Sequence, residues 1–253
     1  MMLLENKIIL ITGAGSGIGR GTAKVLAQEG ATLFLTDINA QALEDTKQLI
    51  QSSNPILTMA VDVSKKEDLE EMMKEIITNF GRLDGAFNNA GISGPSCEFK
   101  DYNDADFDQI ISTDLKSVWM CMKLQINQML TQSTKGAIVN TASVGGLVGK
   151  PGISAYIAAK HGVVGLTKTT SLEYGKHGIR INAVCPGIIR TEMLDQLITS
   201  GTMGTEDDWA QLQPIGRLGT PEEIGEFVAW ALSDRASLLH GQAIALDGGF
   251  TSS

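Results

Sequence analysis

The sequence predicts an α/β fold, a doubly wound parallel sheet of about seven strands with helices on both faces. Three observations predict it. Short apolar runs rich in β-branched residues alternate with helix-like stretches along the 253 residues, which is the pattern of repeated βαβ units. A glycine-rich segment follows the first apolar run directly. Acidic or amide residues close several later runs, so polar side chains are expected at the carboxyl ends of the strands.

The composition is that of a soluble globular protein, with 43% hydrophobic and 19% charged residues. We expect residues 1–253 to form one domain, because no linker or repeat divides them. A net charge of −9 argues against nucleic acid and membrane surfaces as partners. No apolar run approaches the ~20 residues of a membrane span, and Met1 to Lys7 contain no apolar leader, so we expect a cytoplasmic protein.

The cysteines and histidines indicate no metal. Three cysteines, an odd number, are widely spaced without a CxxC pair, and the three histidines are scattered. We expect reduced structural thiols at Cys97, Cys121 and Cys185.

The first strand is expected over Lys7 to Thr12, and a helix-like stretch then runs to Glu29. The turn between them follows the pattern TGxxxGxG, with glycines at positions 13, 17 and 19 around Ser16 and Ile18. Glycines let a pyrophosphate approach the backbone at a helix N-terminus. The turn therefore predicts a nucleotide site at Gly13, Ser16, Gly17, Ile18 and Gly19.

The second strand, Ala31 to Thr36, ends at Asp37, roughly twenty residues past the turn. A carboxylate there accepts hydrogen bonds from the adenosine ribose and repels a 2′-phosphate. Ile38 follows it instead of a cation, and Arg20 is the one nearby positive charge. NAD is therefore favoured over NADP, although Asp37 also fits a helix N-cap.

The third strand, Ile56 to Val61, leads into Asp62 and Val63, and residues 64–67 read as a capping box. The following helix carries apolar residues at 3.6-residue spacing, which predicts core packing: Leu69, Met72, Met73, Ile76, Ile77 and Phe80. The fourth strand, Leu83 to Phe87, precedes Asn88-Asn89-Ala90-Gly91.

A long helix from about Ala105 to Leu130 precedes a fifth strand, 136–141, which leads to Ser143. A further helix, 154–174, places Tyr156 and Lys160 one turn apart on one face. A phenol is a poor acid or base at neutral pH, but a nearby ammonium favours its charged form. The pair therefore predicts a general acid–base group, with Ser143 able to hold a substrate oxygen.

The sixth strand, 179–185, ends at Pro186-Gly187. Residues 191–213 are the least regular stretch. We expect their apolar residues to be exposed, which suggests a mobile lid over the substrate, with a surface helix pair as the alternative. The lid's apolar residues are Met193, Leu194, Leu197, Ile198, Met203, Trp209 and Leu212. Thr220-Pro221 then begins the last helix, and residues 242–246 form the last strand.

These motifs together resemble the short-chain dehydrogenase/reductase family of about 250 residues, over nearly the whole chain. The resemblance is carried by Thr12–Gly19, Asp62-Val63, Asn88–Gly91, Ser143, Tyr156-xxx-Lys160 and Pro186-Gly187 with Thr191. It implies a Rossmann-like fold and commonly a homotetramer, in which the two long helices form subunit contacts.

The resemblance also implies roles for individual residues. Tyr156 exchanges a proton with the substrate, Ser143 anchors it, and Lys160 grips the nicotinamide ribose. Asp62, Val63 and the segment Asn89-Ala90-Gly91 border the cofactor. Ile189 and Thr191, after Pro186-Gly187, hold the nicotinamide carboxamide and a phosphate.

Asp114 departs from the family pattern, in which an asparagine in the long helix holds a water of the proton relay. Asp is nearly isosteric and still accepts hydrogen bonds, but an ionised carboxylate cannot donate one. We expect Asp114 to keep the relay role, with a structural helix residue as the alternative.

The sequence therefore predicts an NAD-dependent oxidoreductase that interconverts a secondary alcohol and its ketone. The segments 83–89 and 176–180 resemble the corresponding segments of family members that act on cyclic alcohols and diols. An apolar lid suits such small-molecule substrates. Two alternatives remain open: a reductase of 3-oxoacyl thioesters, and an NAD(H)-binding sensor or scaffold that does no chemistry.

Overall fold

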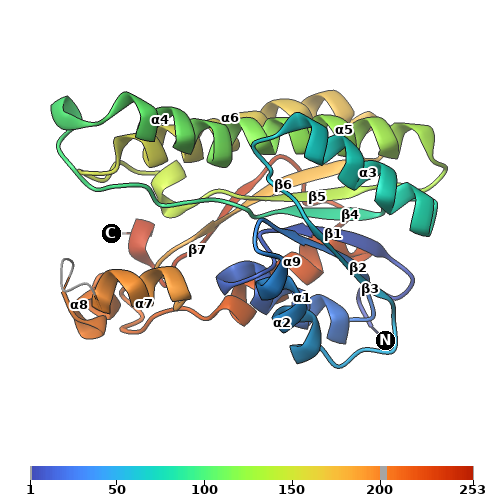
Figure 1. The fold of residues 1–253 in the computed structure, drawn as a ribbon, viewed down its shortest axis with the longest axis horizontal. Coiled ribbons are helices and arrows are strands. Elements are labelled where there is room, and N and C mark those ends of the chain that lie inside the picture. Colours follow the sequence, from blue (N-terminus) through green and yellow to red (C-terminus); the bar gives the residue numbers. More distant parts are fainter. Residues whose placement is uncertain (1, 200–203, 253) are drawn as a thin grey trace.

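A computed structural model describes residues 2–199 and 204–252 and shows a seven-stranded parallel sheet between two layers of helices (Figure 1). The strands are β1 (Ile8–Thr12), β2 (Thr32–Asp37), β3 (Ile56–Ala60), β4 (Gly85–Asn88), β5 (Ala137–Thr141), β6 (Arg180–Pro186) and β7 (Ala243–Leu246). The predicted doubly wound sheet is confirmed, and every predicted strand lies within a few residues of its expected position.

The strand order β3-β2-β1-β4-β5-β6-β7 makes β1 a neighbour of both β2 and β4. The chain therefore winds outward in one direction from β1 to β3 and in the other from β4 to β7. Ligands bind such sheets in the crevice where the winding reverses, outside the carboxyl ends of the strands. Gly13 follows β1 and Asn89 follows β4, so both predicted motifs lie at this crevice.

Two sets of helices cover the two faces of the sheet (Figure 1). One set contains α3 (Lys66–Phe80), α4 (Asp104–Ile110), α5 (Ser117–Thr131) and α6 (Ser154–Tyr174), and the other contains α1 (Gly17–Gln28), α2 (Ala40–Leu49) and α9 (Pro221–Leu232). Each layer has its own apolar core. Met72 of α3 and Val163 of α6 belong to one core, and Val25 of α1 and Val228 of α9 belong to the other.

The helix predicted from about Ala105 to Leu130 is interrupted. Between α4 and α5 the backbone forms a π-helical segment, Ile111–Lys116, which contains Asp114. Apolar periodicity does not reveal such a segment because the flanking turns keep the helical direction. Short π-helical segments occur often at functional sites, since the widened turn re-aims the side chains on it.

The helix after β3 differs from the expected capping box at residues 64–67. The N-cap of α3 is Lys65, which makes no side-chain capping bond. The Ser64 hydroxyl instead donates to the Asp62 carboxylate at 2.6 Å, a local bond two residues back that competes with helix capping. The predicted core stripe is confirmed, with Leu69, Met72 and Ile76 fully buried.

Residues 191–213, the lid segment, contain two helices, α7 (Glu192–Thr199) and α8 (Glu206–Gln211). The expectation that its apolar residues are exposed is wrong for Leu194 and Trp209. Both are buried and pack with Leu218 in a small cluster of their own. Leu212 is half exposed. Met203 and the side chains of Met193 and Leu197 lie outside the described residues.

Across the described part of the chain, none of the helices combines the length and hydropathy that crossing a membrane requires.

Candidate active site

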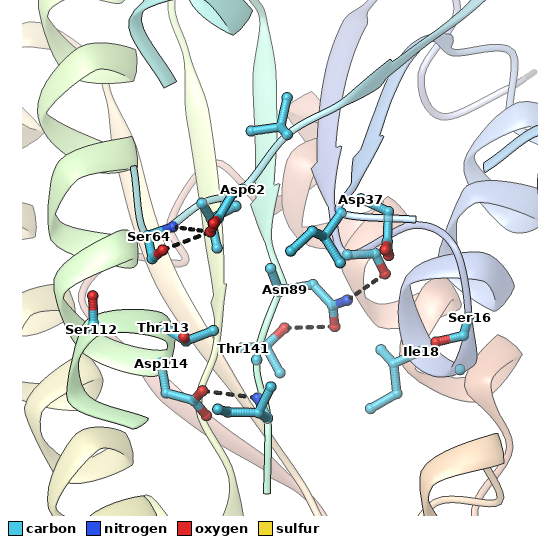
Figure 2. A pocket seen from close by; sticks show the side chains of 18 of the residues that line it. Ser16, Ile18, Asp37, Asp62, Ser64, Asn89, Ser112, Thr113, Asp114 and Thr141 are labelled. Carbon is cyan, nitrogen blue, oxygen red and sulfur yellow. Dashed lines mark hydrogen bonds between the residues drawn. The ribbon is translucent and has the colours of Figure 1, made fainter. Parts of the chain in front are cut away.

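A cavity of about 520 Å³ opens at the carboxyl ends of the strands, within the size range of small-ligand pockets. Figure 2 shows Ser16 and Ile18 from α1 on one side of it and Ser112, Thr113 and Asp114 from the π-helical segment on the other. The structure brings most of the predicted site residues to this cavity: Gly13, Ser16, Gly17, Ile18, Asp37, Asp62, Val63, Asn89, Ala90, Gly91, Asp114, Tyr156, Lys160 and Thr191.

Glycine is required in the turn before α1. Gly13 has a φ of +66°, and a Cβ at that position would lie 2.8 Å from the Cα of Ala90, so glycine lets this turn pack against the segment after β4. Ser16 is the N-cap of α1 but makes no side-chain capping bond. The Gly17 amide donates instead to Glu192 Oε2 at 2.8 Å. A carboxylate of α7 is thus bound at a helix N-terminus, a position that also suits phosphate.

Asp37 ends β2 with its carboxylate on the cavity wall. Its Oδ2 accepts a hydrogen bond from the Gly15 amide and its Oδ1 accepts one from the Asn39 amide, both at 3.0 Å. The N-cap of α2 is Asn39, so the alternative that Asp37 caps this helix is wrong. The Gly15 bond instead ties the carboxylate to the glycine turn.

Arg20, the cation nearest the turn in sequence, is engaged away from the cavity. Its guanidinium pairs with Glu192 at 3.0 Å and donates to Thr46 at 3.0 Å and to the Gly15 carbonyl. Arg20 does not line the cavity.

Asp62 lies after β3 beside Ser64, as Figure 2 shows. The Ser64 hydroxyl donates to Asp62 Oδ1 at 2.6 Å and the Ser64 amide donates to the same oxygen at 3.0 Å. These bonds, with help from Lys65, outweigh the effect of burial and lower the pKa of Asp62. The carboxylate is therefore charged at neutral pH and holds the turn that forms this end of the cavity.

Asn89 joins three strands where the winding of the sheet reverses. Its Nδ2 donates to the carbonyls of Thr12 and Gly13 at 3.2 Å, and its Oδ1 accepts from the Thr141 hydroxyl at 3.2 Å. Both the Asn89 and Ala90 amides donate to the Thr12 hydroxyl. Asn89 therefore fixes the glycine turn against β4 and β5.

Lys160, Tyr156 and Asp114 meet at the inner end of the cavity. Lys160 Nζ lies 5.4 Å from the centroid of the Tyr156 ring and 3.4 Å from Asp114 Oδ2, and it donates to the Thr141 carbonyl at 3.1 Å. Asp114 Oδ1 accepts from the Ile92 amide at 2.9 Å. Asp114 is fully buried, and its Oδ2 has no hydrogen-bond donor among the described residues.

Burial and charge act against each other in this cluster. Burial raises the pKa of Asp114, and the opposing effects of Lys160 and the Ile92 amide do not cancel it. Burial favours the neutral form of Lys160, but the Asp114 carboxylate, with a smaller contribution from the Tyr156 side chain, outweighs it and raises the pKa of Lys160. Lys160 therefore remains a cation despite being enclosed.

Ser143 does not line the cavity directly, but it lies beside Tyr156. A Cβ at Gly145 would lie 3.5 Å from both Ser143 Oγ and Tyr156 Cε1. The Ser143 hydroxyl accepts a bond from the Gly145 amide at 3.0 Å, which leaves its proton available for a substrate oxygen. Gly145 thus provides the space in which the two side chains approach each other.

Four other predicted residues also lie outside the cavity lining: Gly19, Pro186, Gly187 and Ile189. Gly19 instead allows α1 to pack closely on Gly13 and Asn89. Pro186 ends β6, and Ile189 is buried in the core beneath the turn.

Sequence reasoning missed eight residues of the lining: Ile38, Val61, Ser64, Ile92, Gln109, Ser112, Thr113 and Thr141. Thr141 is the last residue of a strand, a position that could have identified it as part of the cavity lining. Ser112 and Thr113 face the cavity because the π-helical segment rotates them inward, and no sequence periodicity signals that rotation.

Among the described residues, no group of three or more His, Cys, Asp or Glu side chains is arranged to hold a metal ion.

Residues 13–251 match a protein family described as Enoyl-(Acyl carrier protein) reductase. The chain is 41% identical to 2,5-dichloro-2,5-cyclohexadiene-1,4-diol dehydrogenase of Sphingobium indicum, over 98% of both chains. It is 40% identical to cyclohexanol dehydrogenase of an Acinetobacter species, over 98% of this chain and 96% of that one.

Solved structures agree with these matches. The crystal structure of levodione reductase superposes with a TM-score of 0.95 at 39% identity, covering 99% of both chains. NAD⁺-bound xylitol dehydrogenase superposes with a TM-score of 0.91 at 30% identity, covering 97% of this chain and 99% of that one. The chain belongs to the short-chain dehydrogenase/reductase family.

Proposed function

We propose that this chain is an NAD-dependent oxidoreductase that interconverts a cyclic, largely apolar secondary alcohol and its ketone. The arrangement of Lys160 and Tyr156 carries the proposal. A buried ammonium lies 5.4 Å from the centre of a phenol ring, inside a cavity whose other end is a glycine turn. Relatives at about 40% identity include a dehydrogenase of a cyclic diol and one of cyclohexanol.

Tyr156 exchanges the hydroxyl proton of the alcohol, and the Lys160 ammonium stabilises the negative charge that develops during this exchange. Ser143 donates its free hydroxyl proton to the same substrate oxygen. The side chains sit on β5, its following turn and α6, which the sheet holds rigidly. Positioning therefore supplies much of the rate enhancement.

The residues around the cavity fit a dinucleotide. The N-terminus of α1 lies at the cavity wall and suits a pyrophosphate, which would replace the Glu192 carboxylate at the Gly17 amide. Asp37 suits ribose hydroxyls. When bound, nicotinamide supplies the site that accepts or donates hydride. In this proposal the cofactor is held by predicted residues that line the cavity: Gly13, Ser16, Gly17, Ile18, Asp37, Asp62, Val63, Asn89, Ala90, Gly91 and Thr191. Gly19, Pro186, Gly187 and Ile189 shape the backbone beside it. Asp37, together with the engagement of Arg20 elsewhere, supports NAD over NADP.

Asp114 is assigned the relay position beside Lys160. Its Oδ2 pairs with the Lys160 ammonium at 3.4 Å and accepts no other hydrogen bond from the described residues. A buried oxygen of this kind suits a bound water, and in this proposal such a water continues the proton relay from Tyr156 beyond Lys160.

Residues 191–213 act as the substrate lid of a single 1–253 domain. Trp209 of α8 stacks against Lys150, whose Nζ lies 4.7 Å from the ring centroid. Lys150 belongs to the loop between Ser143 and Tyr156, so the lid touches the segment that carries the reacting groups.

Assembly as a homotetramer in the cytoplasm completes the proposal. Trp119 of α5 is 45% exposed and lines a groove with Gly162 and Gly165 of α6, on the helices that form subunit contacts in the family. The three cysteines are free thiols, as expected in a reducing compartment.

The first experiment measures NADH formation from NAD and NADPH formation from NADP over a panel of cyclic and open-chain secondary alcohols. Turnover of cyclic alcohols with NAD alone supports the proposal. Turnover of 3-oxoacyl thioesters with NADPH instead supports the thioester reductase. Tight NADH binding without turnover of any alcohol supports the sensor or scaffold.

A further inference from the structure

Gln213, the last residue of the lid segment, has an almost fully enclosed side chain with 2% exposure. Its Oε1 accepts a hydrogen bond from the Ile188 amide at 2.8 Å. Its Nε2 donates to the Ile188 carbonyl at 3.2 Å and to the Arg217 carbonyl at 2.7 Å. One side-chain amide thus binds both backbone groups of Ile188, which makes a stiff two-point attachment.

The segment that Gln213 binds runs from the end of β6 to the cavity. A Cβ at Gly187 would overlap Gln213 Oε1, so glycine is needed there for the amide to reach Ile188. On the other side, the Gly219 amide donates to the Ile188 carbonyl at 3.0 Å and the Arg190 amide donates to the Gly219 carbonyl at 2.9 Å. Gln213 and Gly219 therefore hold the turn from both sides.

Thr191 follows this turn directly and lines the cavity. A Cβ at Gly17 of the glycine turn would lie 3.1 Å from Thr191 Cγ2, so Thr191 lies beside that turn. Gln213 itself does not line the cavity. A side chain that is fully hydrogen-bonded, buried and outside the ligand space can affect the ligand only through the backbone that it holds.

We propose that Gln213 is a positioning residue for the nicotinamide half of the cofactor. It fixes the turn from Gly187 to Thr191 so that the backbone near Ile189 and the Thr191 side chain meet the nicotinamide end. This inference rests on the proposed function, which places NAD in the cavity. Because Gln213 also ends the lid, the lid and the nicotinamide-facing turn share one anchor.

The test compares Gln213→Met and Gln213→Glu with the control Gln211→Met. Met has nearly the volume of Gln but no amide, so both backbone groups of Ile188 lose their side-chain partner. Glu keeps an acceptor for the Ile188 amide but loses the donor. Gln211 is exposed on α8, so its substitution changes the lid surface alone.

The first measurement compares the affinity for NADH with the affinity for ADP-ribose, which lacks nicotinamide. The second compares kcat/KM for NAD with kcat/KM for acetylpyridine adenine dinucleotide, in which an acetyl group replaces the carboxamide. For Gln213→Met we expect roughly tenfold weaker NADH binding, because the released turn must be ordered again when the nicotinamide binds. We expect unchanged ADP-ribose binding and a reduced preference for NAD. Gln213→Glu places a carboxylate oxygen against the carbonyls of Ile188 and Arg217, so its loss of NADH affinity should be at least as large. Gln211→Met should match the wild type.

Equal losses of NADH and ADP-ribose binding in Gln213→Met would overturn the inference, because they indicate general damage to the scaffold. Unchanged NADH binding in either folded Gln213 variant would overturn it too. If Gln213→Met does not fold, the near-isosteric Gln213→Glu decides by the same comparison. The binding measurements need no turnover. A wild type that binds NADH but oxidises no alcohol therefore contradicts the proposed function, while the comparison of NADH and ADP-ribose binding still tests the role of Gln213.

Discussion

Asp114 Oδ2 and Lys160 Nζ lie 3.4 Å apart, and their side chains are 0% and 3% exposed. The pair sits between the Ile92 amide, which donates to Asp114, and the Thr141 carbonyl, which accepts from Lys160. An enclosed ion pair is stable only when hydrogen bonds complete it. The carboxylate therefore balances the lysine charge that acts on Tyr156.

Replacing Asp114 with Asn removes this balancing charge and keeps the shape. The Asp114 carboxylate raises the pKa of the buried Lys160, so without it Lys160 loses its proton at lower pH. We expect the basic limb of the kcat/KM profile for alcohol oxidation to move to lower pH, while the variant remains active at neutral pH. An unchanged pH profile would show that the Asp114 charge has no part in catalysis.

Tyr156→Phe removes the proton-exchanging group alone. General acid–base catalysis contributes about 10²- to 10⁴-fold to rate, so we expect kcat to fall by that range. NADH binding, measured by fluorescence titration, should stay within about twofold because the ring and Lys160 remain. A variant that keeps most of its turnover would rule out the role assigned to Tyr156.

Asp37→Ala tests cofactor selection. The loss of a charged acceptor for ribose hydroxyls should raise the KM for NAD by roughly tenfold. The repulsion of a 2′-phosphate disappears, so the KM for NADP should fall. Asp45→Ala, an exposed carboxylate on the neighbouring helix α2, serves as the control and should change neither value. Equal effects on both cofactors would contradict the assignment.

Lys150→Met tests the contact between the lid and the loop before Tyr156. The cation–π contact with Trp209 contributes about 0.5–1 kcal/mol, so kcat/KM for the alcohol should fall about two- to fivefold with little change in NADH affinity. The matched control is Lys123→Met, which removes the cation–π contact with Trp119, outside the cofactor cavity. The same loss in both variants would argue against a role in closing the lid.

Glu223 at the start of α9 links stability to acid pH. Hydrogen bonds from Arg217 and the Thr220 amide lower its pKa to about 2 from its usual 4.5. Because the folded-state pKa is the lower one, the stabilisation is present above about pH 4.5 and is lost as the pH falls toward 2. The side chain is 47% exposed, so we expect at most about 1 kcal/mol.

In denaturant titrations, Glu223→Gln should therefore be less stable than the wild type at pH 7, and the difference should shrink at pH 3. Glu226→Gln, an exposed position on the same helix, should match the wild type at both pH values. A constant difference for Glu223→Gln would mean that its charge is not responsible.

The sequence by itself determined the order of strands and helices, because alternating apolar runs and helical periodicity are local patterns. It also determined the chemistry at the strand ends: Gly13, Asp37, Asn89, Tyr156 and Lys160 follow fixed spacings and meet at one cavity. Parallel strands bring their carboxyl ends to one edge, so residues distant in the chain could be placed together before any coordinates were known.

Only the tertiary structure decided the features that depend on contacts between distant segments. Three features have no periodic pattern in the sequence that predicts them. They are the π-helical segment that turns Asp114 toward Lys160, the burial of Trp209 against Leu194, and the attachment of Gln213 to Ile188. The partners in the Asp114–Lys160 and Gln213–Ile188 contacts are 46 and 25 residues apart in the chain. Their distance is set only when the whole chain has folded, so no local pattern in the sequence can predict them.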